Sequence, residues 1–580
     1  MTQKVPKELG GVPTPLVEDE DKALIADGAG GYYWGNQVAS VPNVEAVDVS
    51  FDNTVGIPNN PTESQAAIEE VYKRIPASKV VKLCSNSGGH SATSEGVAFI
   101  REDGLGFRMG DNYFHTFADN AIWKQSWGFK DGTESFDRPM PFPIFEFGTK
   151  VHDISLGYHG LMIVTGTEDK PRSKILVSGA YQGTPAFVSD LTQVYEADDN
   201  SVGKRVKKIW SMNFSSIYVS SGYLLENGEL YLTGSRANYQ LGNGEAINNA
   251  YRTDYARADF GVLGVVGQKV TNFVTTSLNA YAEVTTDDNV YKLCAWGYNH
   301  IGQLGLGFVN SKAGSGDGNN SVKTPTYCRS PTDSGGGAHP DGGFIVSSVG
   351  GPFKKILATM NTAYTTCVAV LSANGDLYYA GNSLGGGSDT SQFIKIDSNV
   401  ADFAMCGGST GSVIWCKVDG SVKGGGYNVY GCLGTGNDTD IPLTTATTIY
   451  PAGGINGSPV VECFGPFGSP SSQFVLRTAN GRVYTAGNNV IGTGLIAANS
   501  NVFIPVKLME PIREKGIYMC LGGLFSVYYI GESGTLYAAG NNDRAQLGYS
   551  PNEFTTALTP VPVRTDPGHW ISGRWDFLNT

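Results

Sequence analysis

The chain has 580 residues, a formal net charge of −13, only 16% charged residues and 77 glycines. Because nucleic-acid partners require clustered Lys and Arg, this balance argues against a nucleic-acid partner. No apolar run approaches the roughly 20 residues that span a bilayer, and residues 1–22 lack the basic-then-apolar pattern of a secretion signal. We therefore expect neither nucleic-acid binding nor membrane insertion. Glycine at about twice its average usage suits an architecture with many tight turns.

Residues 1–78 differ in pattern from the rest of the chain. Residues 1–40 contain proline, glycine and charge without periodicity, which predicts an extended segment that becomes ordered against a partner. Residues 47–54 predict a short strand that runs into a turn. A helix is expected to begin at Thr62, which has the capping-box spacing to Gln65, and to end before Pro76.

Two stretches of this region, SFDNT at residues 50–54 and QAAIEEV at residues 65–71, resemble a small module of bacteriophage tail and head fibres. The resemblance implies a segment near the virion-attached end, which commonly belongs to a trimeric stalk. A strand and helix that merely cap the following domain are the alternative interpretation. If the resemblance holds, the residues expected to anchor the chain to the particle are Phe51, Ile68, Val71 and Tyr72.

From residue 79 onward one pattern recurs eight times: a strand, a two-residue turn, a second strand, and a glycine six residues after the turn glycine. Because Asn-Gly and Asp-Gly tolerate positive φ at both turn positions, the pattern predicts type I′ β-hairpins. Two weaker copies run from Ser173 to Gly179 and from Asn289 to Gly297. The six regular copies have their turn and final glycines at Gly104 and Gly110, Gly228 and Gly234, Gly375 and Gly381, Gly420 and Gly426, Gly481 and Gly487, and Gly534 and Gly540.

A second motif, Leu-Gly, ends eight residues after the final glycine of four copies, at Gly242, Gly305, Gly434 and Gly548. Around one of them, residues 296–307 (WGYNHIGQLGLG) resemble the regulator of chromosome condensation repeat, and residues 88–91 and 156–159 resemble its upstream element. The resemblance covers about residues 79–563 and implies an all-β fold, a β-propeller with blades of four antiparallel strands around a central channel. Seven blades are the family norm, whereas eight copies are present, so seven or eight blades are expected.

Two long insertions separate copies of the pattern. Residues 111–147 are dense in aromatic side chains, which would either pack within the protein or at a subunit interface, or contact a receptor. Residues 308–345 are rich in Gly, Ser, Asn and Asp and predict either a solvent-facing recognition loop or a plain linker. Residues 564–580 are expected to dock on the propeller or a neighbour. The aromatic residues expected to contact a receptor or partner are Tyr113, Phe114, Trp123, Trp127, Phe129 and Phe136.

Motifs of catalysis and metal binding are missing from the sequence. It lacks the Gly-x-Ser-x-Gly elbow, the phosphate-binding loop and His-Glu-x-x-His. Cys84, Cys406, Cys463 and Cys520 occupy comparable repeat positions and are expected to be small buried apolar residues rather than metal ligands or disulfides. We therefore expect a protein that is not an enzyme and has no cofactor or metal.

Together these features predict a structural virion protein of a bacteriophage, a tail or head fibre or a fibre-like appendage. Residues 1–78 would contact other virion proteins, and the propeller would contact a glycan or protein of the host surface. A homotrimer is expected because trimers are the norm for fibres. The alternatives are a cellular interaction propeller, such as a small-GTPase exchange factor, and a polysaccharide-degrading fibre.

Overall fold

The computed structural model divides the chain into two units, Met1–Ile68 and Glu69–Thr580. In the first unit it describes residues 22–26 and 32–36. In the second it describes residues 79–563 except for 86–95, 112–134, 143–147, 158–159, 180–187, 199–200, 214–218, 236–238, 246–250, 277, 288, 311–319, 333–334, 361–365, 383, 385–388, 407–410, 466–472, 488–498, 507, 521–525, 543–545 and 549–555.

The first unit contains an antiparallel hairpin of β1(Lys22–Ala26) and β2(Tyr32–Asn36), in which Lys22 lies opposite Asn36. The sequence predicted an extended segment here, although two short apolar runs separated by glycines are a hairpin signal. The strand expected at residues 47–54 and the helix expected from Thr62 lie outside the described residues, as do Phe51, Ile68, Val71 and Tyr72.

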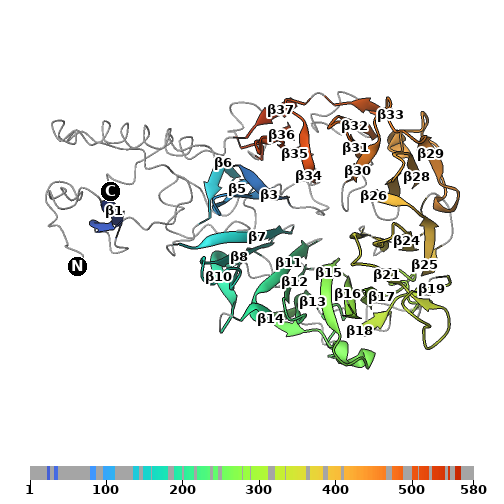
Figure 1. The fold of residues 1–580 in the computed structure, drawn as a ribbon, viewed down its shortest axis with the longest axis horizontal. Helices are drawn as coiled ribbons and strands as arrows, with labels where there is room; N and C mark the ends of the chain where they lie inside the picture. Colours follow the sequence, from blue (N-terminus) through green and yellow to red (C-terminus); the bar gives the residue numbers. More distant parts are fainter. Residues whose placement is uncertain are drawn as a thin grey trace. The chain divides into compact units, whose positions relative to one another are not determined.

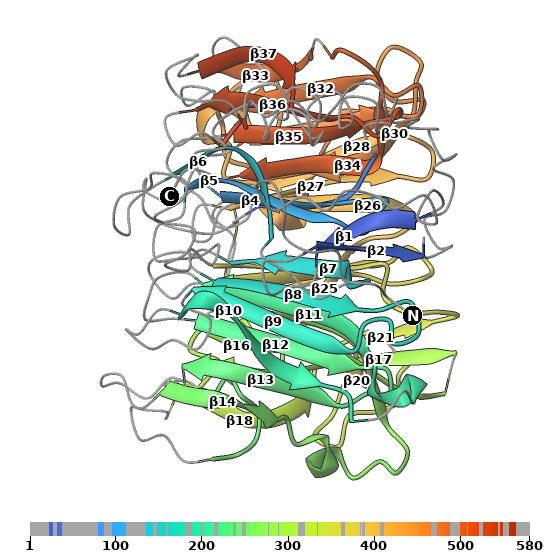
Figure 2. The ribbon, with the colours of Figure 1, turned by 90° about the vertical axis from the view of Figure 1, so that its left-hand side faces the viewer.

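The second unit is a ring of eight antiparallel sheets, each of which we call a blade, taken in chain order around the ring (Figure 1). The first strand of each blade is the innermost and the fourth is the outermost. This settles the number of blades at eight, one for each copy of the sequence pattern. Figure 2 shows the ring from the side, with the strands of successive blades stacked.

Blades 1 to 4 occupy the first half of the ring. Blade 1 comprises β3(Val80–Ser85), β4(Gly96–Arg101), β5(Gly106–Asp111) and β6(Ser135–Pro141), and blade 2 comprises β7(Lys150–Leu156), β8(Gly160–Gly166), β9(Lys174–Gly179) and β10(Val188–Glu196). Blade 3 comprises β11(Val206–Asn213), β12(Val219–Leu225), β13(Leu230–Ser235) and β14(Tyr251–Arg257). Blade 4 comprises β15(Lys269–Thr275), β16(Asn279–Asp287), β17(Val290–Tyr298) and β18(Ser321–Tyr327), with β21(Ser347–Val349) also paired to β17.

Blades 5 to 8 complete the ring. Blade 5 comprises β22(Lys355–Met360), β23(Thr366–Leu371), β24(Leu377–Gly381) and β25(Thr390–Asp397), and blade 6 comprises β26(Val400–Cys406), β27(Ser412–Lys417), β28(Val422–Gly426) and β29(Thr447–Tyr450). Blade 7 comprises β30(Val460–Phe464), β31(Gln473–Thr478), β32(Val483–Gly487) and β33(Ser500–Pro505). Blade 8 comprises β34(Ile512–Cys520), β35(Ser526–Gly531), β36(Leu536–Asn541) and β37(Thr556–Pro562).

Both predicted insertions contribute strands to the ring. β6, the fourth strand of blade 1, lies within residues 111–147. β18, together with the small sheet of β19(Arg329–Ser330) and β20(Phe344–Ile345), lies within residues 308–345. The described helices are single 3₁₀ turns, η3(Val202–Lys204), η4(Phe260–Leu263), η5(Val429–Gly431) and η6(Leu443–Thr445).

The recurring pattern forms the hairpin between the second and third strands of each blade, but the predicted turn type is wrong. In blade 3 only Gly228 of the turn pair has positive φ, at +89°. Its N–H donates to Leu225 O, and the Leu225 N–H donates to the Glu229 carbonyl, both at 3.0 Å. This is a type I turn followed by a left-handed glycine. Asn227 serves instead as an acceptor, because its Oδ1 accepts from the Glu229 N–H at 3.0 Å. The same side-chain bond is made by Asp103, Asp419 and Ser533.

The turn glycine also bonds to the next blade. The Gly375 carbonyl of blade 5 accepts from the Val400 N–H of β26 at 2.9 Å. The same bond closes the ring, because the Gly534 carbonyl of blade 8 accepts from the Val80 N–H of β3 at 3.0 Å. Equivalent bonds join Gly104 to Val151, Arg172 to Val206 and Gly420 to Val460.

The hydrophobic core lies between adjacent blades rather than at the centre of the ring. One buried cluster joins blade 8 to blade 1 and includes Tyr528, Leu536, Phe99 and Phe107. Because blades 1 and 8 share no strand, the ring closes through this cluster and the bond from Val80 to Gly534. The final glycine of the pattern packs closely against its own blade rather than the next one. At Gly297, φ is +105° and a Cβ would lie 2.3 Å from Leu278 O.

Candidate functional site

The aromatic residues predicted to contact a receptor lie almost entirely outside the described part of the chain. Phe136 is in β6, where its backbone pairs with Gly110 of β5. The other five are Tyr113, Phe114, Trp123, Trp127 and Phe129, and they lie outside the described residues. Receptor contact by this group therefore stays a prediction.

Charged side chains of the innermost strands meet charged side chains of the next blade, and in several blades they follow a β-bulge after the first valine. Lys82 of β3 forms an ion pair with Asp153 of β7, and Lys355 Nζ of β22 lies 2.8 Å from Asp402 Oδ1 of β26. Each pair joins one blade to the next. The bulges follow Val80, Val151, Val206, Val270, Val400 and Val460.

Lys208 of β11 belongs to the same set and is more deeply buried. Its Nζ donates to Asn272 Oδ1 at 2.7 Å and to Phe273 O at 2.6 Å, both in β15 of the next blade. Burial lowers the pKa of Lys208 to about 8, although Asp153 opposes this shift. Because each of these charged groups has its partners in the next blade, we interpret them as seam contacts rather than as a ligand site. Among the described residues, no group of three or more His, Cys, Asp or Glu could hold a metal ion.

The cysteines predicted to be small buried residues lie at the inner strands. Cys406 and Cys463 are buried, and burial raises the pKa of the Cys463 thiol well above its ordinary value. Cys84 is half-buried, and its Sγ accepts a hydrogen bond from the Leu156 N–H at 2.9 Å. These three cysteines therefore contribute to packing and to the seams between blades.

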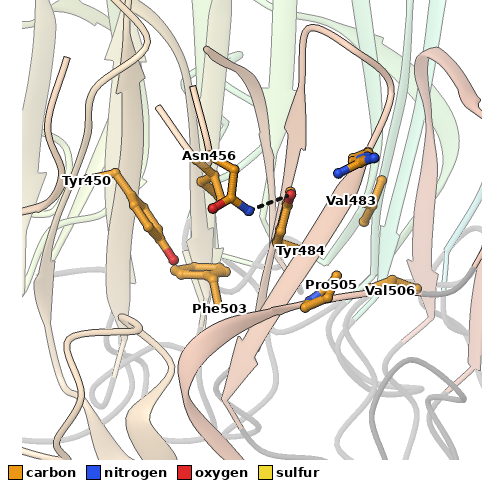
Figure 3. A pocket seen from close by; sticks show the side chains of 9 residues that line it. Tyr450, Asn456, Val483, Tyr484, Phe503, Pro505 and Val506 are labelled. Atoms are coloured by element: carbon orange, nitrogen blue, oxygen red, sulfur yellow. Dashed lines mark hydrogen bonds between the residues drawn. The ribbon is translucent and has the colours of Figure 1, made fainter. Parts of the chain in front are cut away.

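A pocket of about 420 Å³ lies at the outer part of the seam between blades 6 and 7 (Figure 3). Its walls come from the outermost strands β29 and β33, from β32 and the turn that precedes it, and from the connection between β29 and β30. The lining residues are Tyr450, Ile455, Asn456, Arg482, Val483, Tyr484, Phe503, Pro505 and Val506.

The apolar side of the pocket belongs to the core of the two blades. Phe503 and Tyr484 are 7% and 4% exposed. The Phe503 ring packs directly on Gly434, a glycine of the Leu-Gly motif, because a Cβ at Gly434 would lie 2.3 Å from the ring. Gly305 makes the same approach to Phe393 at the seam between blades 4 and 5. Repeat packing therefore holds this aromatic surface in place.

The polar wall is a tight turn at residues 455–458. Asn456 and Gly457 have φ of +52° and +76°, and Ile455 and Ser458 exchange two backbone hydrogen bonds of 3.0 Å. This is the two-residue type I′ geometry. Asn456 Nδ2 donates to the Tyr484 hydroxyl at 3.4 Å, as Figure 3 shows. The wall is therefore formed without a ligand.

The lining combines two residues without a free main-chain donor and several polar side chains. The Val506 N–H already donates a hydrogen bond to Val483 O at 2.9 Å, and Pro505 has no N–H. Burial, and then the neighbouring Tyr484, raises the pKa of Tyr450, so its phenol remains protonated near neutral pH. Within the described residues, no acceptor pairs with the exposed Arg482 guanidinium, and the lining contains no Asp or Glu.

Sequence reasoning missed this pocket. The Asn456-Gly457 pair, set among Gly453, Gly454 and two prolines, marked a tight turn that could have been noticed. What the sequence does not show is that this turn meets Tyr484, because that contact depends on how blades 6 and 7 pack together.

Eight blades, each with the repeated hairpin between its second and third strands, define this protein as an eight-bladed β-propeller. No family model matches the chain. No curated protein matches it either. In its second unit, the described residues contain no helix that is long and apolar enough to cross a membrane.

Several solved structures are similar in fold. Human WBSCR16 is 16% identical with a TM-score of 0.46, covering 72% of this chain and 97% of its own. Prp20p of Saccharomyces cerevisiae, described with its binding to Gsp1p and histones, is 13% identical with a TM-score of 0.43, covering 86% and 89%. Sqt1 of Chaetomium thermophilum, bound to the N-terminus of ribosomal protein L10, is 12% identical with a TM-score of 0.35, covering 81% and 95%. The likeness concerns fold alone.

Proposed function

We propose that this protein is a non-catalytic interaction scaffold, in which a rigid propeller presents its connecting segments to a macromolecular partner. The supporting observation is that the repeated residues are used within the ring. The turn glycines bond to the next blade, and the inner-strand charges pair across seams. Recognition on rigid scaffolds commonly lies on loops. The segments outside the repeat are therefore left for binding.

Within this class, we propose a structural component of a bacteriophage particle, a tail or head fibre or a fibre-like appendage. Residues 1–78 would attach it to other virion proteins, and the propeller would contact a host glycan or protein. The support is the resemblance of residues 50–54 and 65–71 to fibre modules. The division of the chain at Ile68 is compatible with an attachment segment separate from the propeller. A homotrimer in the virion is part of this proposal.

Deletion of residues 1–78 tests the attachment claim. The truncated chain should keep the propeller, because β3 begins at Val80, but should no longer enter particles. The measurement is quantitative mass spectrometry of purified particles produced with each form. Circular dichroism and thermal unfolding of the truncated protein provide the control for folding. Incorporation at the full-length level would contradict the proposal.

The second candidate is a cellular interaction propeller, such as a small-GTPase exchange factor. It is favoured by the resemblance of residues 296–307 to the chromosome condensation repeat. Nucleotide release from a panel of small GTPases discriminates the two proposals, since a virion scaffold should not accelerate release. A polysaccharide-degrading fibre would instead liberate oligosaccharides from host capsule.

A further inference from the structure

We propose that the pocket between blades 6 and 7 binds an acidic sugar, a pyranose ring that carries a carboxylate, within a longer glycan. The inference uses the geometry of this seam alone. It does not depend on residues 1–78 or on the aromatic residues of 111–147. It therefore stands or fails separately from the virion proposal.

The size and surface of the pocket fit a sugar ring. Its volume of about 420 Å³ falls in the range of small-molecule sites, which are mostly apolar with a few placed polar groups. Tyr450, Tyr484 and Phe503 bring aromatic rings from three different strands to one space (Figure 3). Aromatic rings offer apolar faces at low conformational cost, and the two tyrosines add hydroxyl groups. Tyr450 is half-buried and offers ring surface to the C–H face of a pyranose, whereas Tyr484 and Phe503, 4% and 7% exposed, contribute little ring surface.

The hydrogen-bonding groups fit neighbouring hydroxyl groups. Asn456 uses Nδ2 for the bond to Tyr484, which leaves its Oδ1 as an acceptor and the Tyr484 O–H as a donor. The Tyr450 O–H is a second donor. Because the type I′ turn holds Asn456 in place, little ordering is required when a ligand binds.

The charge of the pocket selects the carboxylate. Arg482 lies at the pocket, has no partner among the described residues, and is the lone charged side chain of the lining. A guanidinium binds a carboxylate through two parallel hydrogen bonds. Glycoside hydrolysis usually requires two carboxylates, and the lining provides neither. The site is therefore suited to binding and not to cleavage.

A peptide is a poorer occupant. An extended peptide bonds mainly through a free strand edge, where main-chain groups give the affinity. Here Val506, Ile455 and Ser458 already use their backbone N–H groups within the fold, and Pro505 has none. These four residues therefore offer a peptide no free main-chain donor.

The experiment is isothermal titration of the full chain with a panel of disaccharides. The disaccharides contain glucuronic, galacturonic or sialic acid, each with a neutral counterpart, and a short peptide with a free carboxyl terminus is titrated beside them. An acidic member should bind saturably and more tightly than its neutral counterpart. Arg482→Ala should weaken acidic-sugar binding by about tenfold or more, because a charge-assisted pair is lost. Binding of the neutral counterpart should change by less than about twofold.

Two further variants separate the site from general effects. Asn456→Gly keeps the positive φ of the turn but removes the amide, and should weaken acidic and neutral sugars alike by about fivefold. Lys354→Ala removes an exposed cation from the start of blade 5 and should leave binding unchanged. Thermal unfolding confirms that each variant is folded. Three results would overturn the proposal: no saturable binding of any acidic sugar, equal binding by Arg482→Ala, or tighter binding of carboxyl-terminal peptides.

Discussion

Asp397 at the end of β25 shows how a single side chain joins two blades. Its Oδ2 accepts from Trp415 Nε1 at 2.9 Å, and its Oδ1 accepts from Lys417 Nζ at 2.9 Å, both in β27 of blade 6. Lys423 of β28 adds an ion pair of 3.1 Å. Burial alone would raise the pKa of Asp397, but these donors outweigh it and lower the pKa to about 2.

Replacement of this residue should give a measurable pH signature. In the unfolded chain the carboxyl binds its proton near 3.8, and in the folded chain near 2, so its stabilisation is present above 3.8 and is lost as pH falls toward 2. Asp397→Asn should destabilise the protein by about 1 to 2 kcal/mol at pH 7. The difference in free energy of unfolding between Asp397→Asn and the unmodified protein should shrink as the pH falls from 4 to 2.

Scanning calorimetry across this pH range is the measurement. Asp438→Asn, at an exposed acid in a blade 6 loop, is the matched control and should follow the unmodified protein. A difference in unfolding free energy that stays constant with pH would show that the Asp397 carboxylate is not the source of the stability.

At the scale of elements, the hairpins could be predicted from the sequence, but their contacts could not. Spacing and alternation identified each second and third strand, because hairpin formation is local. The turn type was wrong because Asn227 has two uses in turns, positive φ or side-chain acceptance, and composition does not separate them. The bond from Gly375 to Val400 and the meeting of Asn456 with Tyr484 depend on neighbouring blades. Local sequence patterns do not predict contacts between blades.

The contact between a turn and the next blade can be tested with two glycines of similar conformation. Gly228 and Gly436 have φ of +89° and +85°. A Cβ at Gly228 would lie 2.9 Å from Lys269 Cβ and 3.1 Å from its Cα, whereas a Cβ at Gly436 meets nothing within 4 Å. Gly436→Ala should cost about 1 to 2 kcal/mol from backbone strain. Gly228→Ala should cost about 1 to 3 kcal/mol more, because β15 must shift.

Thermal unfolding of the two variants gives this comparison directly. Equal destabilisation would mean that the hairpin of blade 3 does not press on blade 4 in solution. Both variants should keep the circular dichroism spectrum of a β protein at low temperature, since each change is confined to one turn.

At the scale of the whole molecule, the seam between blades 8 and 1 differs from the others because the chain does not continue across it. Each other seam has a covalent connection from one blade to the next, whereas this one has contacts alone. They are the bond from Val80 to Gly534, the cluster around Phe99 and Tyr528, and the guanidinium of Arg513. Arg513 donates to Val80 O at 3.2 Å and to Val81 O at 3.0 Å.

This difference predicts where the ring opens first. The Val80 and Val400 amides donate to equivalent turn carbonyls, at 3.0 and 2.9 Å, so their local chemistry is matched. Because local openings with few constraints cost the least free energy, the Val80 amide should exchange with deuterium faster than the Val400 amide. Arg513→Ala should raise the exchange rate of the Val80 amide about three- to tenfold, because one or two hydrogen bonds are lost. The exchange rate of the Val400 amide should stay unchanged. Equal protection of the two amides, or equal acceleration by Arg513→Ala, would mean that the ring opens as one cooperative unit and that its unlinked seam is as stable as the linked ones.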